Sequence, residues 1–326
     1  MATHARWMAI AVSLLPCNCC SAERRNKEFR RSFLLSGGML YLKKEWYFGG
    51  GSDIRRVETL PLSEHAVLTA YLHSDSPDLR ALEAVSRPAI IICPGGRYAF
   101  CADVERDVPA ISFLNMGLQV FVLDYSVEPF AGDKRPLTDL ALAMKLVRER
   151  SVEWQIDAHK IAVCGFSAGG HLAASLGVHW NDSQVMSRCG TADAALLRPD
   201  AMVLCYPVIT AGEYRHKSSI TNVSSDCEES LNYWSLETQV STSTPPTFLW
   251  HTMTDKTVPV ENSILLLQQL RAHGVPCECH LFAEGPHGMS AATRETSKPS
   301  AAVHEWIHLC RNWLSAQFGP LGGEAH

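Results

Sequence analysis

A pentapeptide near the middle of the chain, Gly165-Phe-Ser-Ala-Gly169, has the spacing of a serine nucleophile held in a tight turn. It fits the pattern G-x-S-x-G, follows an apolar run (161–164) and precedes a run of small residues (168–178), which predicts the order strand, turn, helix. Such a turn leaves no room for a Cβ two residues before or after the serine, so both positions require glycine. We therefore expect the Ser167 hydroxyl to be presented above the end of a strand. The alternative, a nucleotide-binding turn, is disfavoured because neither G-x-G-x-x-G nor G-K-[ST] occurs.

A serine hydroxyl is a poor nucleophile near neutral pH, so it needs a base and an acid that orients the base. Asp255 and His287 follow Ser167 in the order serine, acid, histidine that this type of turn predicts. Each lies just beyond a predicted strand, at the edge where open parallel sheets place their sites. Of the fourteen histidines, only His287 combines this order with a glycine-flanked loop. Glu284 is a rival acid, but it lies on the same short loop as His287. We expect Ser167, His287 and Asp255 to act as nucleophile, base and orienting acid.

Attack by a serine on a carbonyl group creates an oxyanion, which two converging N–H donors must stabilise. The backbone N–H of Ala168, at the start of the predicted helix, supplies one donor. We expect the second from the loop Pro94-Gly-Gly-Arg-Tyr98, with Gly96 as the donor and Arg97 beside it. A plain Pro-Gly turn is the alternative for this loop when it is considered alone. Three tyrosines are candidate substrate contacts: Tyr98, Tyr206 and Tyr214.

Short apolar runs alternate with helical periodicities through most of the chain. The predicted strands are 89–93, 118–124, 161–164, 201–206, 248–251 and 277–282, and the predicted helices are 104–117, 137–147, 168–178, 260–273 and 303–314. Nearly continuous apolar strands between helices predict a mostly parallel sheet with helices on both faces. The segment 210–244 interrupts this alternation because it is polar and rich in Ser and Thr. Core strands follow it, so we expect a lid insertion rather than a linker.

The first part of the chain lacks this pattern. We expect residues 1–50 to be an N-terminal extension, disordered or a leader, and residues 51–320 to form one α/β catalytic domain. An apolar run from Trp7 to Leu15 is too short to span a bilayer. The cysteines are scattered without a zinc-binding pattern, which favours reduced thiols and a cytoplasmic protein. The alternative is a secreted protein in which residues 1–22 act as a weak signal peptide.

Composition excludes several classes of protein. The chain has 326 residues, of which 46% are hydrophobic and 19% charged, and its formal net charge is −5. Such a chain can bury a sizeable core, and it is not a disordered, collagen-like or disulfide-scaffold sequence. Its mild acidity argues against nucleic acid or an anionic membrane as the main partner. The twelve cysteines alone would suggest thiol redox chemistry, and no other feature of the sequence supports it.

Taken together, these motifs resemble the α/β-hydrolase esterase/lipase superfamily. The similarity is greatest to the acetyl esterases grouped with acetylxylan esterases and bacterial feruloyl-esterase-like domains, and it extends over about residues 57–313. The matching segments are 94–98, 121–125, 165–172, 247–252, 258–263 and 287–288. Where this family usually has P-G-G-G-Y, the present chain has Arg97 in place of the third glycine.

The resemblance implies serine carboxylester hydrolysis through an acyl-enzyme, with no metal or organic cofactor. Its triad would fall on Ser167, Asp255 and His287, with Ala168 and the Gly96 region as oxyanion donors. The implied substrates are small-molecule esters with short acyl groups, especially acetyl groups on sugars or xylo-oligosaccharides. No nucleic-acid partner and no membrane span are expected, and a homo-oligomer is left open. The alternatives are an arylformamidase or a serine peptidase with the same fold, or a non-catalytic binding protein.

Overall fold

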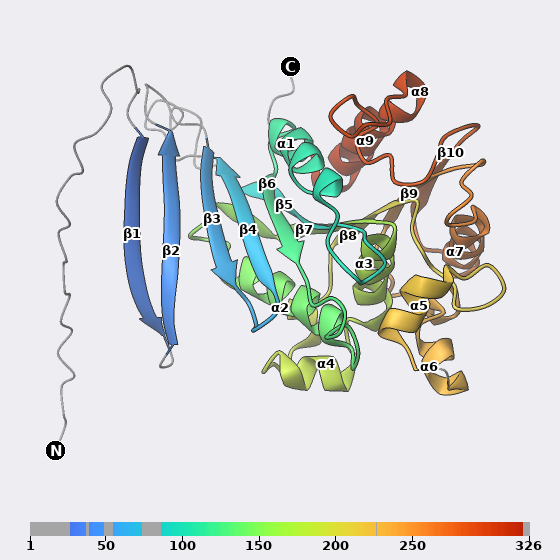
Figure 1. Cartoon of the computed structure of the whole chain (residues 1–326), viewed down its shortest axis with the longest axis horizontal. Coiled ribbons are helices and arrows are strands. Elements are labelled where there is room, and N and C mark those ends of the chain that lie inside the picture. The colour runs from blue at the N-terminus through green and yellow to red at the C-terminus, as the bar shows by residue number, and fades with distance from the viewer. Residues whose placement is uncertain (1–26, 37–38, 49–54, 74–85, 226, 322–326) are drawn as a thin grey trace.

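The computed structural model describes residues 27–36, 39–48, 55–73, 86–225 and 227–321. Within these residues a single sheet has the strand order β1-β2-β3-β4-β6-β5-β7-β8-β9-β10 (Figure 1). The strands are β1 Lys27–Ser36, β2 Met39–Phe48, β3 Arg55–Pro61, β4 Val67–His73, β5 Arg87–Cys93, β6 Gln119–Asp124, β7 Ile156–Phe166, β8 Ala201–Cys205, β9 Thr247–Thr252 and β10 Cys277–Phe282. The helices are α1 Asp107–Asn115, α2 Arg135–Glu149, α3 Ala168–His179, α4 Ser183–Arg188, α5 Lys217–Val223, α6 Glu228–Tyr233, α7 Glu261–Ala272, α8 Ala301–His304 and α9 Trp306–Phe318.

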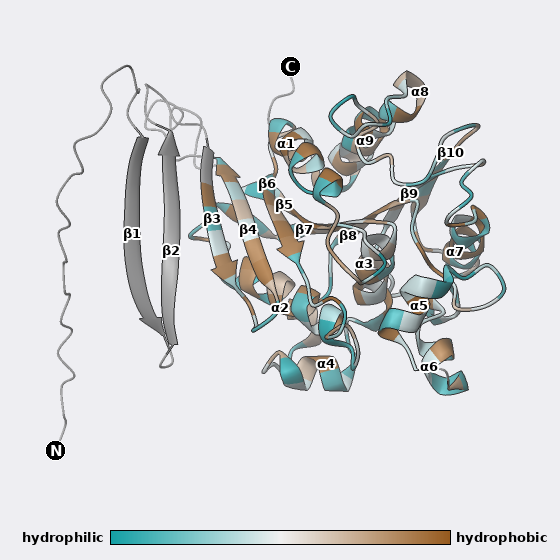
Figure 2. Ribbon diagram, viewed as in Figure 1, coloured by the Kyte–Doolittle hydropathy of each residue, from teal (hydrophilic) through white to brown (hydrophobic). Residues whose placement is uncertain are grey.

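The six strands predicted from apolar runs are confirmed as β5 to β10. Strand β5 pairs in parallel with β6 and β7, and β7, β8, β9 and β10 continue the parallel ladder. Every residue of β8 and β9 is buried, as strands with helices on both faces require. Hydrophobic residues concentrate on the central strands, whereas the outer helices α4 and α6 carry many polar residues (Figure 2).

The two faces of the sheet carry separate cores. Ile91 of β5 belongs to one core, together with Leu140 of α2 and Leu172 of α3. Its neighbours Ile90 and Ile92 point the other way, as alternate residues of a strand must, into a core that α1 and α9 complete. The predicted architecture, a mostly parallel sheet with helices on both faces, is therefore confirmed.

The N-terminal half of the sheet differs from the expectation. Strands β1 to β4 pair with one another in antiparallel order, and β4 also pairs with β6 in antiparallel order. Within the range 1–50, which the sequence predicts to be an N-terminal extension (disordered or a leader), residues 27–36 and 39–48 pair as strands. The rest of that range lies outside the described residues, and the extension itself stays a prediction. Aromatic and aliphatic residues flank Gly37 and Gly38 in the sequence, which is a hairpin signal. The charged residues at 23–31 lie next to this hairpin signal and weaken it.

The segment 210–244 contains α5, α6 and a short 3₁₀ helix, Leu236–Gln239. It is anchored by a small apolar cluster in which Ile220 of α5 meets Val208 and Val258. Whether this segment acts as a lid remains a prediction. No helix in the described ranges has both the length and the apolar character needed to cross a membrane. The nine cysteines among the described residues are free.

The central strand gives a stability prediction. Replacing Ile91 by Ala leaves a cavity between β5, α2 and α3, because this side chain is 0% exposed. We expect the free energy of unfolding in urea to fall by about 2–5 kcal/mol. The control is Val152→Ala, at a position that is 91% exposed, which should change it by less than about 0.5 kcal/mol. Equal effects of the two substitutions would contradict the burial assigned to β5.

Candidate active site

Ser167 occupies the turn between β7 and α3. Its backbone has φ 54° and ψ −117°, a conformation that residues other than glycine rarely adopt and that costs about 1–3 kcal/mol. A Cβ on Gly165 would collide with the carbonyl of Gly169, and a Cβ on Gly169 would collide with the carbonyl of Cys93. The expectation that both motif glycines are required by space is confirmed. Ser167 is fixed further because its N–H donates to the carbonyl of Cys205 at 3.0 Å.

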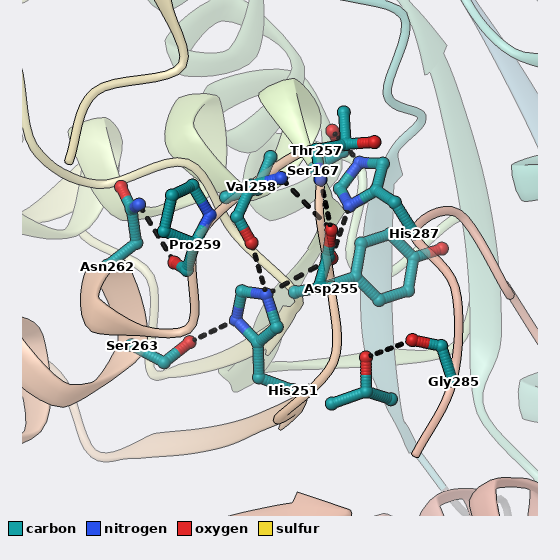
Figure 3. A network of polar contacts seen from close by, with 12 residues as sticks. Ser167, His251, Asp255, Thr257, Val258, Pro259, Asn262, Ser263, Gly285 and His287 are labelled. Carbon is teal, nitrogen blue, oxygen red and sulfur yellow. Dashed lines mark hydrogen bonds and ion pairs between the residues drawn. The ribbon is translucent and has the colours of Figure 1, made fainter.

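Three side chains from three loops form a hydrogen-bonded chain at the C-terminal edge of the sheet (Figure 3). The Nε2 atom of His287 lies 2.7 Å from Ser167 Oγ. Its Nδ1 atom lies 2.6 Å from Asp255 Oδ2. Because a carboxylate only accepts hydrogen bonds, Nδ1 carries the proton, and Nε2 is left to accept from the serine hydroxyl. The structure thus brings together the three residues that the sequence pointed to.

Asp255 is held as an anion by the loop that follows β9. Its Oδ1 atom accepts from the backbone N–H groups of Thr257 (2.8 Å) and Val258 (3.0 Å). Burial alone would raise the pKa of Asp255, but hydrogen bonds from His251 and His287 outweigh burial and hold this pKa well below its usual value. The rival acid, Glu284, is exposed and has no hydrogen bond to His287 within the described part of the chain.

A second histidine contacts the same carboxylate, and the sequence did not indicate this role. His251 is 0% exposed, and its Nε2 atom lies 3.2 Å from Asp255 Oδ2 and 3.1 Å from the carbonyl of Val258. Both partners accept, so Nε2 is the donor. Its Nδ1 atom is 2.7 Å from Ser263 Oγ on α7. His251 therefore links α7 to the acid (Figure 3). The only sequence signal was its position near the end of a strand, four residues before Asp255.

The loop predicted to supply the second oxyanion donor packs directly against the serine. A Cβ on Gly95 would lie 3.0 Å from the Cβ of Ser167. Gly96 has φ 127°, and a side chain there would strike the carbonyl of Phe100. The N–H of Gly95 is already bound to Glu105 at 2.7 Å. Among the described residues, no hydrogen bond outside the regular helices and strands uses the N–H of Ala168 or Gly96, so both are available to an oxyanion.

Arg97, which was expected beside the oxyanion donor, lies on the surface of the loop. Arg97 has φ 61° and an exposed side chain 5.7 Å from the centre of the Phe100 ring. Its carbonyl accepts from Asn222 of α5 at 2.8 Å, which joins the segment 210–244 to the oxyanion loop.

The three tyrosines separate into two groups. Tyr98 is 0% exposed, and its hydroxyl is 2.8 Å from His171 Nδ1. Tyr206 is 2% exposed, and its hydroxyl is bound to Glu105. These two side chains are therefore packed inside the protein, where Tyr98 contacts His171 and Tyr206 contacts the ring of His287. Tyr214 is 37% exposed and remains a candidate contact.

A hollow of about 740 Å³ borders His287. Polar side chains contribute to its lining beside apolar ones: the polar residues are Thr254, Lys256, Thr257, Glu284, Ser297, Lys298 and Ser300, and the apolar ones are Pro286, Met289 and Pro299. Hydroxyl and ammonium groups of this kind can bind a hydroxylated molecule through hydrogen bonds. Within the described residues, no group of three or more His, Cys, Asp or Glu side chains is arranged to hold a metal ion.

Solved structures with the same architecture include esterases. The acetyl ester-xyloside bifunctional hydrolase of Caldicellulosiruptor lactoaceticus is 35% identical, with a TM-score of 0.69, over 81% of this chain and 97% of that one. The carboxylesterase Cest-2923 of Lactobacillus plantarum is 27% identical, with a TM-score of 0.71, over 83% of this chain and 99% of that one. The fold and these similarities define a serine-type α/β hydrolase of the carboxylic ester hydrolase class.

The family assignment follows from a second set of similarities. The BD-FAE family matches residues 79–270, and the chain belongs to this family. The endo-1,4-beta-xylanase B of Butyrivibrio fibrisolvens is 38% identical over 233 residues, which are 70% of this chain and 35% of that protein. The acetylxylan esterase of Xylanibacter ruminicola is 30% identical over 221 residues, 65% of this chain and 43% of that protein. The chain thus spans less than half the length of these two relatives.

The low pKa of Asp255 gives a stability prediction with a definite sign. An unfolded Asp has a pKa of about 3.9, and the folded pKa lies below that value, so the unfolded state binds more protons as the solution becomes acidic. The stabilisation by this carboxylate is therefore complete above about pH 5 and is lost as the pH falls toward the folded pKa. We expect Asp255→Asn to lower the free energy of unfolding in urea by roughly 1–3 kcal/mol at pH 7, with a gap to wild type that narrows toward pH 3.

The control for this experiment is Glu64→Gln, whose side chain is 88% exposed. It should remain within about 0.5 kcal/mol of wild type across the same pH range. A gap between wild type and Asp255→Asn that widened on acidification would contradict the anionic state of Asp255.

Proposed function

We propose that this chain is a serine carboxylesterase that hydrolyses short-chain acyl esters, above all acetyl esters of sugars or xylo-oligosaccharides, through an acyl-enzyme on Ser167. The observation that carries the proposal is the contact chain from Ser167 Oγ to His287 (2.7 Å) and from His287 to Asp255 (2.6 Å). These lengths are within the range that proton transfer from nucleophile to base requires. The names of the relatives from Caldicellulosiruptor and Xylanibacter support acetyl and xylose-based esters.

In the acylation step, Ser167 Oγ attacks the ester carbonyl carbon while its proton passes to His287 Nε2. The carbonyl oxygen becomes an oxyanion, for which the N–H groups of Ala168 and Gly96 are the proposed donors. Asp255 holds the Nδ1 proton and balances the charge of the imidazolium. As the C–O bond to the alcohol breaks, the imidazolium gives its proton to the departing oxygen, which leaves an acetyl group on Ser167.

In the deacylation step, a water molecule takes the place of the alcohol. His287 Nε2 removes its proton as the water oxygen attacks the acyl carbon, and a second oxyanion forms in the same position. The intermediate then releases Ser167 Oγ, which recovers its proton from the imidazolium, and the acid departs. The net reaction is ester plus water to acid plus alcohol, and each residue returns to its starting state.

The surroundings of Ser167 support a small acyl group and a polar alcohol. Ser167 is 5% exposed, and Gly95 lies against its Cβ, which restricts the space beside the nucleophile. The hollow next to His287 has hydroxyl and ammonium groups among its lining residues. We further propose that the segment 210–244, which reaches the oxyanion loop through Asn222, limits the size of the alcohol.

Replacing the nucleophile tests the mechanism. Ser167→Ala removes the oxygen that forms the acyl-enzyme, so kcat/KM for p-nitrophenyl acetate should fall by roughly 10⁴- to 10⁶-fold. The matched control is Ser187→Ala, at an exposed position on α4, which should retain wild-type activity. Turnover retained by Ser167→Ala would exclude the proposed nucleophile.

A substrate series tests specificity. We expect kcat/KM for p-nitrophenyl esters to fall at least about tenfold from acetyl to octanoyl, because a long acyl chain must bury surface beside an enclosed serine. Acetylated xylo-oligosaccharide should release acetate. N-formylkynurenine and peptide substrates are included because an arylformamidase or a serine peptidase could use the same three residues. Faster turnover of either of these would replace the esterase assignment.

A further inference from the structure

A buried carboxylate that takes no part in the mechanism above lies beneath the active site. Glu105 ends a short 3₁₀ helix before α1, Asp103–Glu105, and is 3% exposed. Its Oε2 atom accepts from the N–H of Gly95 at 2.7 Å. Its Oε1 atom accepts from the hydroxyl of Tyr206 at 2.6 Å. Both oxygens are therefore engaged by donors, which is the arrangement that an ionised carboxylate requires.

Each of the two donors belongs to a different part of the site. Gly95 precedes the proposed oxyanion donor Gly96 and packs against the Cβ of Ser167. The ring of Tyr206 lies 5.0 Å from the ring of His287, at an interplanar angle of 71°. The hydroxyl of Tyr206 also accepts from the N–H of Ser290 at 2.8 Å, three residues beyond His287. One carboxylate thus connects the oxyanion loop to the loop that carries the base.

Glu105 also contributes charge. The pKa of Glu105 is raised above its usual value because burial outweighs the hydrogen bonds from Tyr206 and Gly95 and the positive charges of His287 and Lys298, all of which lower it. In a buried site such as this, an anion interacts with a nearby cation more strongly than it would in water. An anionic Glu105 therefore favours a proton on His287, over and above the direct contact with Asp255.

Other charged or titratable groups also face His287. Lys298 donates to the carbonyls of His287 (2.6 Å) and Gly288 (3.1 Å). His216, at the start of α5, is close enough to His287 for their charges to interact, as it is to Arg97 and Asp255. Lys298 opposes protonation of His287, whereas Asp255 and Glu105 favour it. The removal of Glu105 therefore has a predictable sign.

We propose that Glu105 is a positioning residue of the esterase reaction: it fixes the oxyanion loop through Gly95 and, through Tyr206, supports His287 in its protonated form. This inference rests on the proposed function, since it concerns the same serine, base and oxyanion donors. When His287 takes the proton of Ser167, positive charge develops on the imidazole and negative charge on the substrate oxygen. Glu105 is connected to the oxyanion loop through the N–H of Gly95 and to the imidazole through the hydroxyl of Tyr206. The loss of Glu105 therefore affects the transition state more than the bound ester.

The variant Glu105→Gln separates charge from shape, because glutamine has nearly the same volume and no charge. Its NH₂ group must face either Gly95 N–H or Tyr206 O–H, so at least one hydrogen bond is lost. We expect kcat for p-nitrophenyl acetate to fall roughly 10- to 100-fold with KM changed less than about threefold. The acid limb of the kcat/KM profile should move to lower pH by several tenths of a unit, because His287 loses its proton more easily without the anion.

The variant Tyr206→Phe keeps the charge of Glu105 and removes the hydroxyl that links it to the loop of His287. We expect kcat to fall roughly 10-fold, with the acid limb moving less than in Glu105→Gln. The matched control is Asp139→Asn on α2. Asp139 is also buried, and it accepts from Ser126 N, Ser126 Oγ and Ser63 Oγ, none of which touches the triad. This control should lower the thermal midpoint without moving the pH profile.

The outcomes distinguish this inference from the proposed function. A wild-type enzyme without esterase activity would overturn both. An active wild-type enzyme, with folded Glu105→Gln that keeps its kcat and its acid limb, would overturn the role of Glu105 alone. If Glu105→Gln fails to fold, as judged by its thermal transition, Tyr206→Phe decides, and unchanged kcat in that variant would also overturn the inference.

Discussion

The site depends on one steric constraint, the contact between the first turn of α3 and the end of β5. Gly169 lies so close to the carbonyls of Cys93 and Pro94 that no Cβ fits between them. The nucleophile turn and the oxyanion loop are therefore positioned by the same contact, because Ser167 immediately precedes α3 and the loop immediately follows Cys93. The parallel pairing of β5 with β7 keeps the C-terminal ends of these two strands adjacent. A Cβ on residue 169 would push the nucleophile turn away from the oxyanion loop and so separate the serine from one of its oxyanion donors.

The site residues that could be predicted from the sequence are those that directly follow a predicted strand. Ser167, Asp255 and His287 each lie just beyond a strand whose apolar run is visible in the sequence, and parallel strands bring such positions to one edge. His251 and Glu105 could not be assigned, because their importance comes from partners that the fold supplies. Tyr206 is 101 residues from Glu105, and no local pattern relates the two. Tyr98 and Tyr206 were expected to contact substrate, but tertiary packing buries both rings.

The limits of strand prediction follow from the same reasoning. Strands β5, β6, β8 and β9 and the second half of β7 are almost wholly buried and appear as apolar runs, so the sequence identifies them. The edge strand β10 is only partly buried and is indicated by the alternation of its residues. Strand β4 alternates between half-buried and buried residues, and this weaker pattern was missed. For β1 and β2, a hairpin signal was present around two glycines but was outweighed by nearby charges. Antiparallel edge strands therefore account for the main difference between the expected and the observed sheet.

Arg97 is the position where the chain departs from the P-G-G-G-Y pattern that the family resemblance predicts, and its contacts bear on how an arginine fits there. Its backbone has φ 61°, which is favourable for glycine and costs other residues about 1–2 kcal/mol. The hydrogen bond from Asn222 to its carbonyl and the contact with Phe100 both oppose this cost. The side chain is exposed, so it does not fill the space around the loop. The guanidinium thus adds a positive charge on the oxyanion loop, close enough to His216 to join burial and the charge of His287 in lowering the pKa of that histidine.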